Sequence, residues 1–266
     1  MMRFPLRLTA DLTIARFSQK LRTKPERSPL LLLNPMTSAG ADGHDSGKLS
    51  FKSKPGTELL DCVRRSSAPV VWIGGAEPLL HPEMGQLTRC IAGIGRHVFL
   101  ETGGALLRRR IHEFRPVSRL FLVLKLHGLE TAYDLRAQLP GAFQAAMEGL
   151  RVARLSGFLT CVHARIDEET RLSDIAEFIR HAKTLDVDGV VISPTGGANS
   201  ASRSGEAPRR KTAEARKLIG NRWWEFFSQL VEPVLGGDVE TVRSAENNGA
   251  GIEAEADTNK ESVRIA

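Results

Sequence analysis

The sequence predicts an α/β fold in which six parallel strands alternate with helices and curl into a partial (βα)6 barrel, with a helical arm before it and a disordered tail after it. Two observations predict the barrel. Short apolar runs recur between Pro29 and Pro194 with little polar alternation, as strands buried on both faces require, and helical patterns separate them. A chain of 266 residues, 41% of them hydrophobic, can bury one substantial core.

The barrel is expected in residues 29–197, where strand and helix candidates alternate. The strand candidates are 30–34, 69–73, 97–101, 119–125, 159–166 and 189–193. The helix candidates are 57–66, 82–94, 105–114, 142–156 and 172–185. The last of these begins with the capping residues Ser173 and Asp174, and its apolar positions follow one helical face. A barrel or part-barrel is the natural closure of this βα order.

The arm, residues 1–28, reads as a basic amphipathic helix. Its apolar positions are spaced i, i+4, i+7 and i+11, and they are Ala10, Ile14, Phe17 and Leu21. Basic residues Arg16, Lys20 and Arg22 occupy other positions. A helix that packs this apolar face on the barrel is the preferred interpretation, and a helix that lies on a membrane surface is the alternative.

The chain after the barrel divides into residues 198–236, a loop and an aromatic helix, and residues 237–266, a tail. Residues 195–208 are rich in Gly, Ser and Ala and predict a mobile loop. Residues 222–235 predict a helix that caps the core, because four aromatic residues gather there: Trp223, Trp224, Phe226 and Phe227. A lipid or partner surface is the alternative for this helix. Large hydrophobic residues nearly vanish from the tail, which predicts disorder.

Composition and charge exclude several classes of protein. No apolar run approaches the ~20 residues that span a membrane, and Arg7 and Asp11 interrupt any signal-peptide pattern, so a cytoplasmic location is expected. The three cysteines, Cys62, Cys90 and Cys161, lie 28 and 71 residues apart, which predicts small buried hydrophobic residues and no zinc site or redox pair. The net charge of +6 is modest, and its basic clusters lack interleaved aromatics, so nucleic-acid binding is not expected.

The segment from Gly75 to Pro82, Gly-Ala-Glu-Pro-Leu-Leu-His-Pro, lies between a strand and a helix candidate. It resembles the GGEP motif of radical S-adenosylmethionine (SAM) enzymes, in particular the adenosylhopane synthases of hopanoid biosynthesis. The resemblance implies a TIM-like partial barrel of the radical SAM type. It also implies a vestigial SAM site at Gly75, Ala76, Glu77 and Pro78, with Glu77 receiving the amino group of SAM. Taken alone, the same residues also fit an ordinary βα turn with a solvated acid.

The loop after the first strand departs from that family. Members carry CxxxCxxC there, three thiolates for a [4Fe–4S] cluster, and the matching positions in this chain are Ala39, Gly43 and Ser46. Alanine and glycine have no donor atom, and a serine hydroxyl replaces a thiolate poorly. No [4Fe–4S] cluster is therefore expected, and SAM would bind weakly because the iron that chelates it is lost. Asp42, His44 and Asp45, together with Ser46, offer alternative metal ligands, but a solvated loop is preferred and no metal site is assigned.

Further departures fall at the ends of later strands. Glu101 stands where the hopanoid subgroup usually has Cys, Gly103 where it has Asn, and His163 where Asn is usual. Lys125 and His127 stand where His and Asp are expected. A His127–Glu101 acid–base pair and a Glu101–Lys125 ion pair across the barrel mouth are both open interpretations.

Three functions are compatible with these residues, and no catalytic residue is assigned. The first is a degenerate radical SAM-like protein that regulates or scaffolds hopanoid biosynthesis, with an active homologue or a pathway enzyme as partner and peripheral membrane contact through the arm. The second is a cluster-free binder of SAM or a related small molecule. The third is an enzyme, either of the adenosylhopane synthase type with unorthodox cluster ligands from the three cysteines or one that uses His127, Glu101 or His163.

Overall fold

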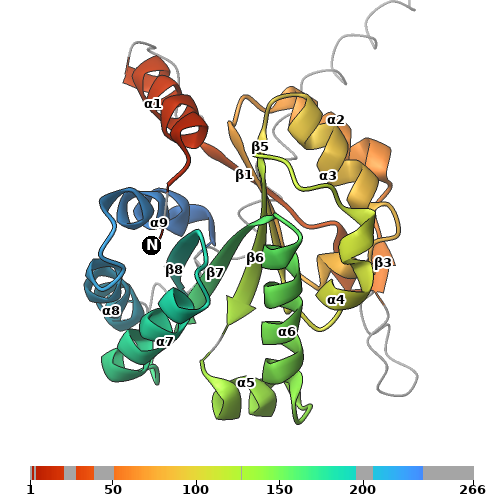
Figure 1. The fold of residues 1–266 in the computed structure, drawn as a ribbon. Coiled ribbons are helices and arrows are strands. Elements are labelled where there is room, and N and C mark those ends of the chain that lie inside the picture. The colour runs from red at the N-terminus through yellow and green to blue at the C-terminus, as the bar shows by residue number, and fades with distance from the viewer. Residues whose placement is uncertain are drawn as a thin grey trace, which may run out of the picture.

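The computed structural model describes residues 2, 4–20, 28–38, 51–126, 128–195 and 206–235 (Figure 1). Its strands are β1 (Leu30–Leu33), β2 (Met36–Ser38), β3 (Phe51–Ser53), β4 (Val70–Ile73), β5 (His97–Thr102), β6 (Leu120–Leu126), β7 (Leu159–Ile166) and β8 (Gly189–Pro194). Its α-helices are α1 (Leu6–Lys20), α2 (Gly56–Arg65), α3 (Met84–Gly93), α4 (Leu107–Arg110), α5 (Glu130–Ala137), α6 (Ala142–Leu155), α7 (Leu172–Thr184), α8 (Glu206–Lys217) and α9 (Arg222–Leu235). Two 3-10 turns, η1 (Pro78–Leu80) and η2 (Ile111–Glu113), complete the described elements.

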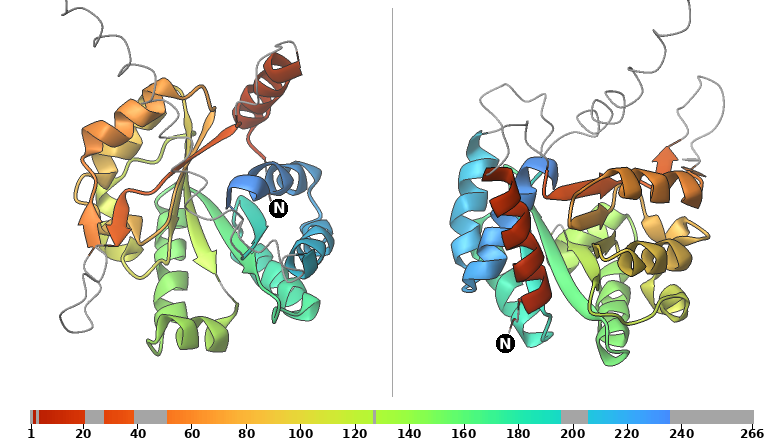
Figure 2. Two further views of the ribbon diagram at one scale, coloured as in Figure 1. Left: turned by 180° about the vertical axis from the view of Figure 1, so that it is seen from behind. Right: turned by 90° about the horizontal axis from the view of Figure 1, so that it is seen from above.

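Six strands form one parallel sheet in the order β1-β4-β5-β6-β7-β8, and the sheet curls into an open half-barrel. Each predicted strand is present with its ends shifted by at most two residues, so the predicted partial barrel is confirmed. Because all six strands run the same way, their carboxyl ends meet at one mouth. Figure 2 shows α2 and α3 at one end of the curled sheet and α8 and α9 at the other.

Several of the described elements were not predicted from the sequence. The hairpin β2–β3 and the short helix α5 were not predicted, and the predicted helix 105–114 is divided into α4 and η2. The predicted loop 195–208 is wrong in its last residues, because α8 begins at Glu206. The other predictions for residues 196–205, and the predicted disorder of 237–266, lie outside the described residues.

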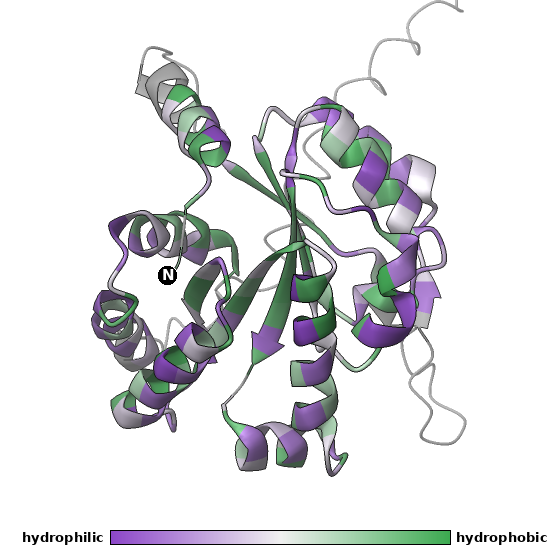
Figure 3. Cartoon of the chain, viewed as in Figure 1, coloured by the Kyte–Doolittle hydropathy of each residue, from purple (hydrophilic) through white to green (hydrophobic). Residues whose placement is uncertain are grey.

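The core has two faces, because alternate residues of each strand point to opposite sides of the sheet. On β4, Val71 and Ile73 pack with the outer helices, whereas Trp72 belongs to the cluster inside the half-barrel. Figure 3 shows nearly continuous hydrophobic strands and helices that alternate between polar and apolar positions. This is the pattern that a parallel sheet covered by helices produces.

Helix α9 closes the open side of the half-barrel, since it contacts both edge strands, β1 and β8. Its Trp224 and Phe227 are fully buried, and the Phe227 ring stacks on Phe99 at a centroid distance of 4.9 Å. Phe99 in turn stacks on Trp72 at 5.4 Å and on Phe121 at 4.4 Å. The prediction of an aromatic capping helix is therefore confirmed. The stacked rings line the inside of the half-barrel, called the lumen below, and form its aromatic floor.

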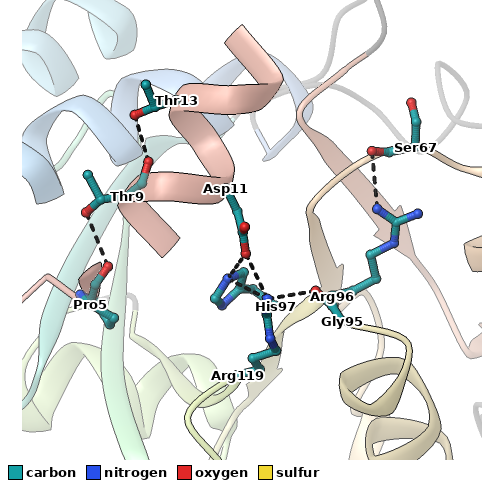
Figure 4. Close-up of polar contacts among 9 residues, drawn as sticks. All are labelled: Pro5, Thr9, Asp11, Thr13, Ser67, Gly95, Arg96, His97 and Arg119. Atoms are coloured by element: carbon teal, nitrogen blue, oxygen red, sulfur yellow. Dashed lines mark hydrogen bonds and ion pairs between the residues drawn. The ribbon is translucent and has the colours of Figure 1, made fainter. Parts of the chain in front are cut away.

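Helix α1 crosses the amino-terminal ends of the strands and is held there by a charged cluster (Figure 4). The carboxylate oxygen Oδ2 of Asp11 lies 2.8 Å from Nε2 of His97 and 2.8 Å from Nη1 of Arg119. Arg119 also donates to the carbonyl oxygen of Gly95 at 2.7 Å. Burial would raise the pKa of Asp11, but the hydrogen bonds from Arg119 and His97 outweigh it and lower that pKa. Asp11 is therefore ionised and ties the arm to β5 and β6.

The face of α1 that packs on the barrel differs from the predicted one. Leu8 and Leu12 are buried in the lumen-side cluster on either side of Asp11. Ala10 and Ile14, which the sequence analysis placed on the barrel, are exposed. The prediction that the arm packs on the barrel is confirmed, but the predicted face is wrong. The hydrogen bonds of Asp11 to His97 and Arg119, which are far away in the sequence, turn the opposite face of the helix toward the barrel. Leu21 lies outside the described residues, and the side chain of Phe17 is not described.

Removing the Asp11 carboxylate should destabilise the protein by about 1–2 kcal/mol, because a partly buried acceptor of two charge-assisted hydrogen bonds is lost. Urea unfolding of Asp11→Ala measures the change. The matched control is Asp61→Ala, whose ion pair with Arg64 is exposed by 54% and 60% and should contribute less than about 0.5 kcal/mol. Equal losses in the two variants would contradict the anchoring role of Asp11.

Candidate functional site

The turn after β4 brings the backbone close to its neighbours at the mouth of the half-barrel. Gly75 has a φ of +89°, and a Cβ there would lie 2.7 Å from Oδ1 of Asn34. A Cβ on Gly74 would lie 2.8 Å from Oε2 of Glu101. The positive φ favours glycine at position 75, which belongs to the predicted SAM site, and a side chain at position 74 would displace the end of the Glu101 side chain.

Glu77 links this turn to the end of β5. Its Oε1 accepts hydrogen bonds from the backbone N–H of Leu79 at 3.1 Å and from the hydroxyl of Thr102 at 2.7 Å, and its Oε2 accepts from the N–H of Gly103 at 2.9 Å. Pro78, buried, begins η1 directly after it. An ionised carboxylate can accept about four hydrogen bonds, so three protein donors leave room for one further donor. Glu77 thus has a structural role that the sequence did not reveal, and its predicted role toward the amino group of SAM stays a prediction.

Tyr133 covers the same corner from α5, a helix that the sequence analysis missed. Its hydroxyl donates to the carbonyl oxygen of Gly103. Burial, followed by the negative charges of Glu77 and Asp134, raises the pKa of Tyr133 to about 12. The phenol therefore stays protonated at neutral pH and acts as a hydrogen-bond donor.

A second polar group lies inside the lumen and joins three strands. Nδ1 of His163 on β7 is 2.5 Å from Oε1 of Glu101 on β5, and Nε2 of His163 is 2.7 Å from the hydroxyl of Ser193 on β8. All three side chains are buried. The edge of the Trp72 ring packs against the His163 ring, with centroids 5.3 Å apart, so the network rests on the aromatic floor.

The protonation state of this network follows from its charges. Burial would raise the pKa of Glu101, but His163, and then Lys125 and Arg165, lower it to about 2. Burial lowers the pKa of His163 and outweighs the opposing effect of Glu101. The arrangement consistent with both shifts is an ionised Glu101 that accepts from the Nδ1–H of a neutral His163, whose Nε2 accepts from the Ser193 hydroxyl.

The sequence predictions for these residues are corrected in part. The direct partner of Glu101 is His163. The Lys125 amine donates to the carbonyl oxygen of Gly75 at 3.3 Å and acts on Glu101 through its charge, without a direct ion pair. Residue 127 lies outside the described residues, as do the cluster positions Ala39, Gly43 and Ser46 and the alternative ligands Asp42, His44 and Asp45. The hydrogen bond between Glu101 and His163, 62 residues apart, had no local signal in the sequence.

The three cysteines do not form a common site. Cys161 is buried on β7 in the lumen-side cluster, and burial raises its pKa. Cys62, on α2, packs against the cluster on the outer face of the sheet, and Cys90 is half-buried on α3. The alternative hypothesis that these three thiols hold an iron–sulfur cluster is therefore wrong, because the thiols lie on different faces of the sheet. Within the described ranges, no group of three or more His, Cys, Asp or Glu residues is arranged to hold a metal ion.

Two polar atoms beside the turn are buried without a hydrogen-bond partner. They are Oδ1 of Asn34, which faces Gly75, and Nε1 of Trp72, which lies near Gly74 and Glu101. A buried acceptor and a buried donor without partners are costly. Both atoms lie beside the turn that follows β4.

Acid should destabilise the fold in two steps. Burial lowers the pKa of His97 and His163 below the ordinary 6.5, so the unfolded chain takes up protons first and stability falls as the pH drops through 6.5. Glu101, with a pKa of about 2 when folded against 4.5 otherwise, contributes stability that is present above pH 4.5 and lost as the pH falls toward 2. Urea midpoints measured along the pH scale test this, and His163→Gln should flatten the first step. A midpoint that rises on acidification would contradict these assignments.

The open half-barrel and the Gly75–Pro78 turn at its mouth define a fold of the radical SAM type. The structure of Streptococcus suis SuiB bound to S-adenosylmethionine has a similar fold, with a TM-score of 0.54 and 14% identity over 84% of this chain and 52% of SuiB. That likeness establishes the fold.

Curated proteins are similar to part of the chain. The chain is 29% identical over 130 residues to the AdoMet-dependent heme synthase of Methanosarcina barkeri. The aligned region covers 48% of this chain and 37% of that protein. It is 21% identical over 165 residues to the pre-heme d1 synthase of Dinoroseobacter shibae. That aligned region covers 61% of this chain and 41% of that protein. The chain thus spans less than half the length of these relatives. No family model matches it.

Proposed function

We propose that this chain is a degenerate radical SAM-fold protein that works without an iron–sulfur cluster, as a non-catalytic regulator or scaffold in hopanoid biosynthesis. The link to hopanoids is supported by the segment from Gly75 to Pro82 and its resemblance to adenosylhopane synthases. The loss of the cluster is supported by Ala39, Gly43 and Ser46, none of which supplies a thiolate.

The observation that carries the proposal is the Glu101–His163–Ser193 network. Two positions where the chain departs from the subgroup, 101 and 163, are hydrogen-bonded to each other at 2.5 Å. Their polar groups are satisfied inside the protein and sit above a packed aromatic floor. A lumen whose polar groups bind one another supports a structural role for these residues.

The test of this role is crosslinking in the native cell with the tagged full chain, followed by identification of the crosslinked proteins. Recovery of a radical SAM homologue or a hopanoid enzyme, in amounts that an untagged cell does not yield, is the expected result. If neither protein is recovered although the tagged chain is abundant and folded, the scaffold proposal fails.

The unpartnered Asn34 favours a second candidate, a cluster-free binder of SAM. The residues fit an ammonium group: Asn34 Oδ1 lacks a partner beside Gly75, and Glu77 can accept one more hydrogen bond. A bound SAM would supply a sulfonium cation and an amino acid group as recognition elements. Weak binding is expected, because the chelating iron is lost.

Calorimetric titration of the full chain with SAM tests this candidate. Asn34→Ala and Glu77→Ala should abolish the heat of binding, while Leu80→Gln, an exposed neighbour of Glu77, should leave it unchanged. Circular dichroism verifies that each variant is folded, since Glu77 also holds β5. Heat that neither substitution alters would refute SAM binding at this turn.

A further inference from the structure

Helix α1 presents an apolar stripe to solvent. Leu6 is 86% exposed and Ile14 is 63% exposed, and Ala10 between them is exposed as well. With a spacing of i, i+4 and i+8, the three residues share one side of the helix. Leu8 and Leu12 lie on the opposite side and are buried in the protein. The helix therefore has two apolar faces, and only one is covered by its own chain.

The charged residues in the sequence of α1 are mostly basic. Its sequence carries the basic residues Arg7, Arg16 and Lys20 and a single acidic residue, Asp11. Asp11 is hydrogen-bonded to His97 and Arg119 and turns toward the barrel (Figure 4). Arg7, next to the apolar stripe, is exposed. The only acidic residue in the helix sequence is thus neutralised on the inner side, and the exposed Arg7 places a positive charge beside the apolar stripe.

An exposed indole lies close to the start of this helix. Trp223 is 45% exposed and stacks on Phe4 at a centroid distance of 5.7 Å, two residues before Leu6. Tryptophan is the residue that most often sits at the boundary between a bilayer and water. Within the described part of the chain, no helix is long and apolar enough to cross a membrane.

We propose that α1 binds the surface of an anionic phospholipid bilayer, with Leu6, Ala10 and Ile14 inserted at the boundary between headgroups and acyl chains. Exposed apolar residues beside basic ones are the two features of a helix that lies in the membrane plane, and the positive charges complement anionic headgroups. The Asp11–His97–Arg119 cluster fixes which side of the helix faces outward. This proposal is independent of the function proposed above.

Co-sedimentation of the full chain with vesicles tests the proposal. Vesicles of equal parts phosphatidylcholine and phosphatidylglycerol should bind the protein, and vesicles of phosphatidylcholine alone should bind it at least about tenfold less, as should the anionic vesicles in molar salt. The double variant Leu6→Gln/Ile14→Gln should lose about tenfold or more in affinity for the anionic vesicles. Arg7→Glu should weaken binding as well.

Matched controls come from helices other than α1. Leu135 on α5 and Leu155 on α6 are 80% and 79% exposed, so Leu135→Gln/Leu155→Gln removes as much exposed apolar surface without touching α1. Arg109→Glu, exposed on α4, matches Arg7→Glu in charge. Both controls should bind anionic vesicles as the parent chain does, and exposed substitutions should leave the fold intact.

Two results would overturn the proposal. One is the absence of binding to anionic vesicles, or a loss of binding that the control variants share. The other is a dimer in vesicle-free solution, measured by light scattering, that Leu6→Gln/Ile14→Gln dissociates. In that case the stripe is covered by a second copy of the chain and not by lipid.

Discussion

Replacing Glu101 by leucine should destabilise the protein by about 1–3 kcal/mol, because it leaves a buried hydrogen-bond donor of His163 without an acceptor. The Nδ1–H of His163 lies 2.5 Å from the Glu101 carboxylate, and both side chains are inside the lumen. Without Glu101, this N–H has no hydrogen-bond acceptor, because the aromatic rings beneath it supply none. Urea unfolding of Glu101→Leu, monitored by circular dichroism, measures the loss.

The coupling of the two residues is the sharper test. His163→Asn alone leaves the Glu101 carboxylate without its ring partner, and Glu101→Cys alone leaves His163 without its carboxylate. The double variant Glu101→Cys/His163→Asn removes both partners of the hydrogen bond at once, so neither the carboxylate nor the imidazole is left without the other. It should cost about 1–3 kcal/mol less than the sum of the single changes. Strict additivity would show that the two departures are independent.

A control for this cycle is an ion pair on the surface. Arg108 and Glu148 lie 2.8 Å apart and are exposed by 63% and 52%. Glu148→Leu should cost less than about 1 kcal/mol, because solvent screens exposed pairs. A loss as large as that of Glu101→Leu would mean that burial does not set the energy of these pairs.

Gly189→Ala should destabilise the protein by about 3 kcal/mol, at the upper end of the usual cost of overpacking. A Cβ on Gly189 would lie 2.1 Å from Cζ2 and 2.2 Å from Cε2 of Trp224. The Trp224 ring is rigid and fully buried, so α9 must move away from β8 to make room. Thermal unfolding of the variant measures the effect.

Gly93→Ala is the matched control for this substitution. Gly93 ends α3, and a Cβ there meets nothing within 4 Å. Alanine in a helix is favoured over glycine, so this variant should be neutral or stabilised by up to about 1 kcal/mol. Similar losses at Gly189 and Gly93 would contradict the close packing of α9 on β8.

The strands were predictable from the sequence because each is a short, nearly continuous apolar run. Helix α8 was not, because its buried face consists of small or polar residues. Pro208, Thr212 and Ala215 are the buried residues described within it, and none of them is a large hydrophobic residue. Helix α5 was missed for a similar reason, since Tyr133 supplies its buried side chain.

The arm and the lumen show a different limit of prediction. Two apolar stripes compete on α1, and the sequence cannot choose between them, since the partners of Asp11 lie 86 and 108 residues further along the chain. The GGEP-like turn was located correctly after β4, because its motif is local. The Glu101–His163–Ser193 network joins three strands, so its residues could be named from the sequence but not paired.

Anaerobic reconstitution of the full chain with iron and sulfide, followed by iron analysis and the visible absorption spectrum, tests the central claim most directly. The parent chain should retain no iron and show no cluster absorption. The positive control is Ala39→Cys/Gly43→Cys/Ser46→Cys, which restores the CxxxCxxC spacing and should gain a cluster. A stoichiometric cluster in the parent chain would contradict the claim that this protein works without one.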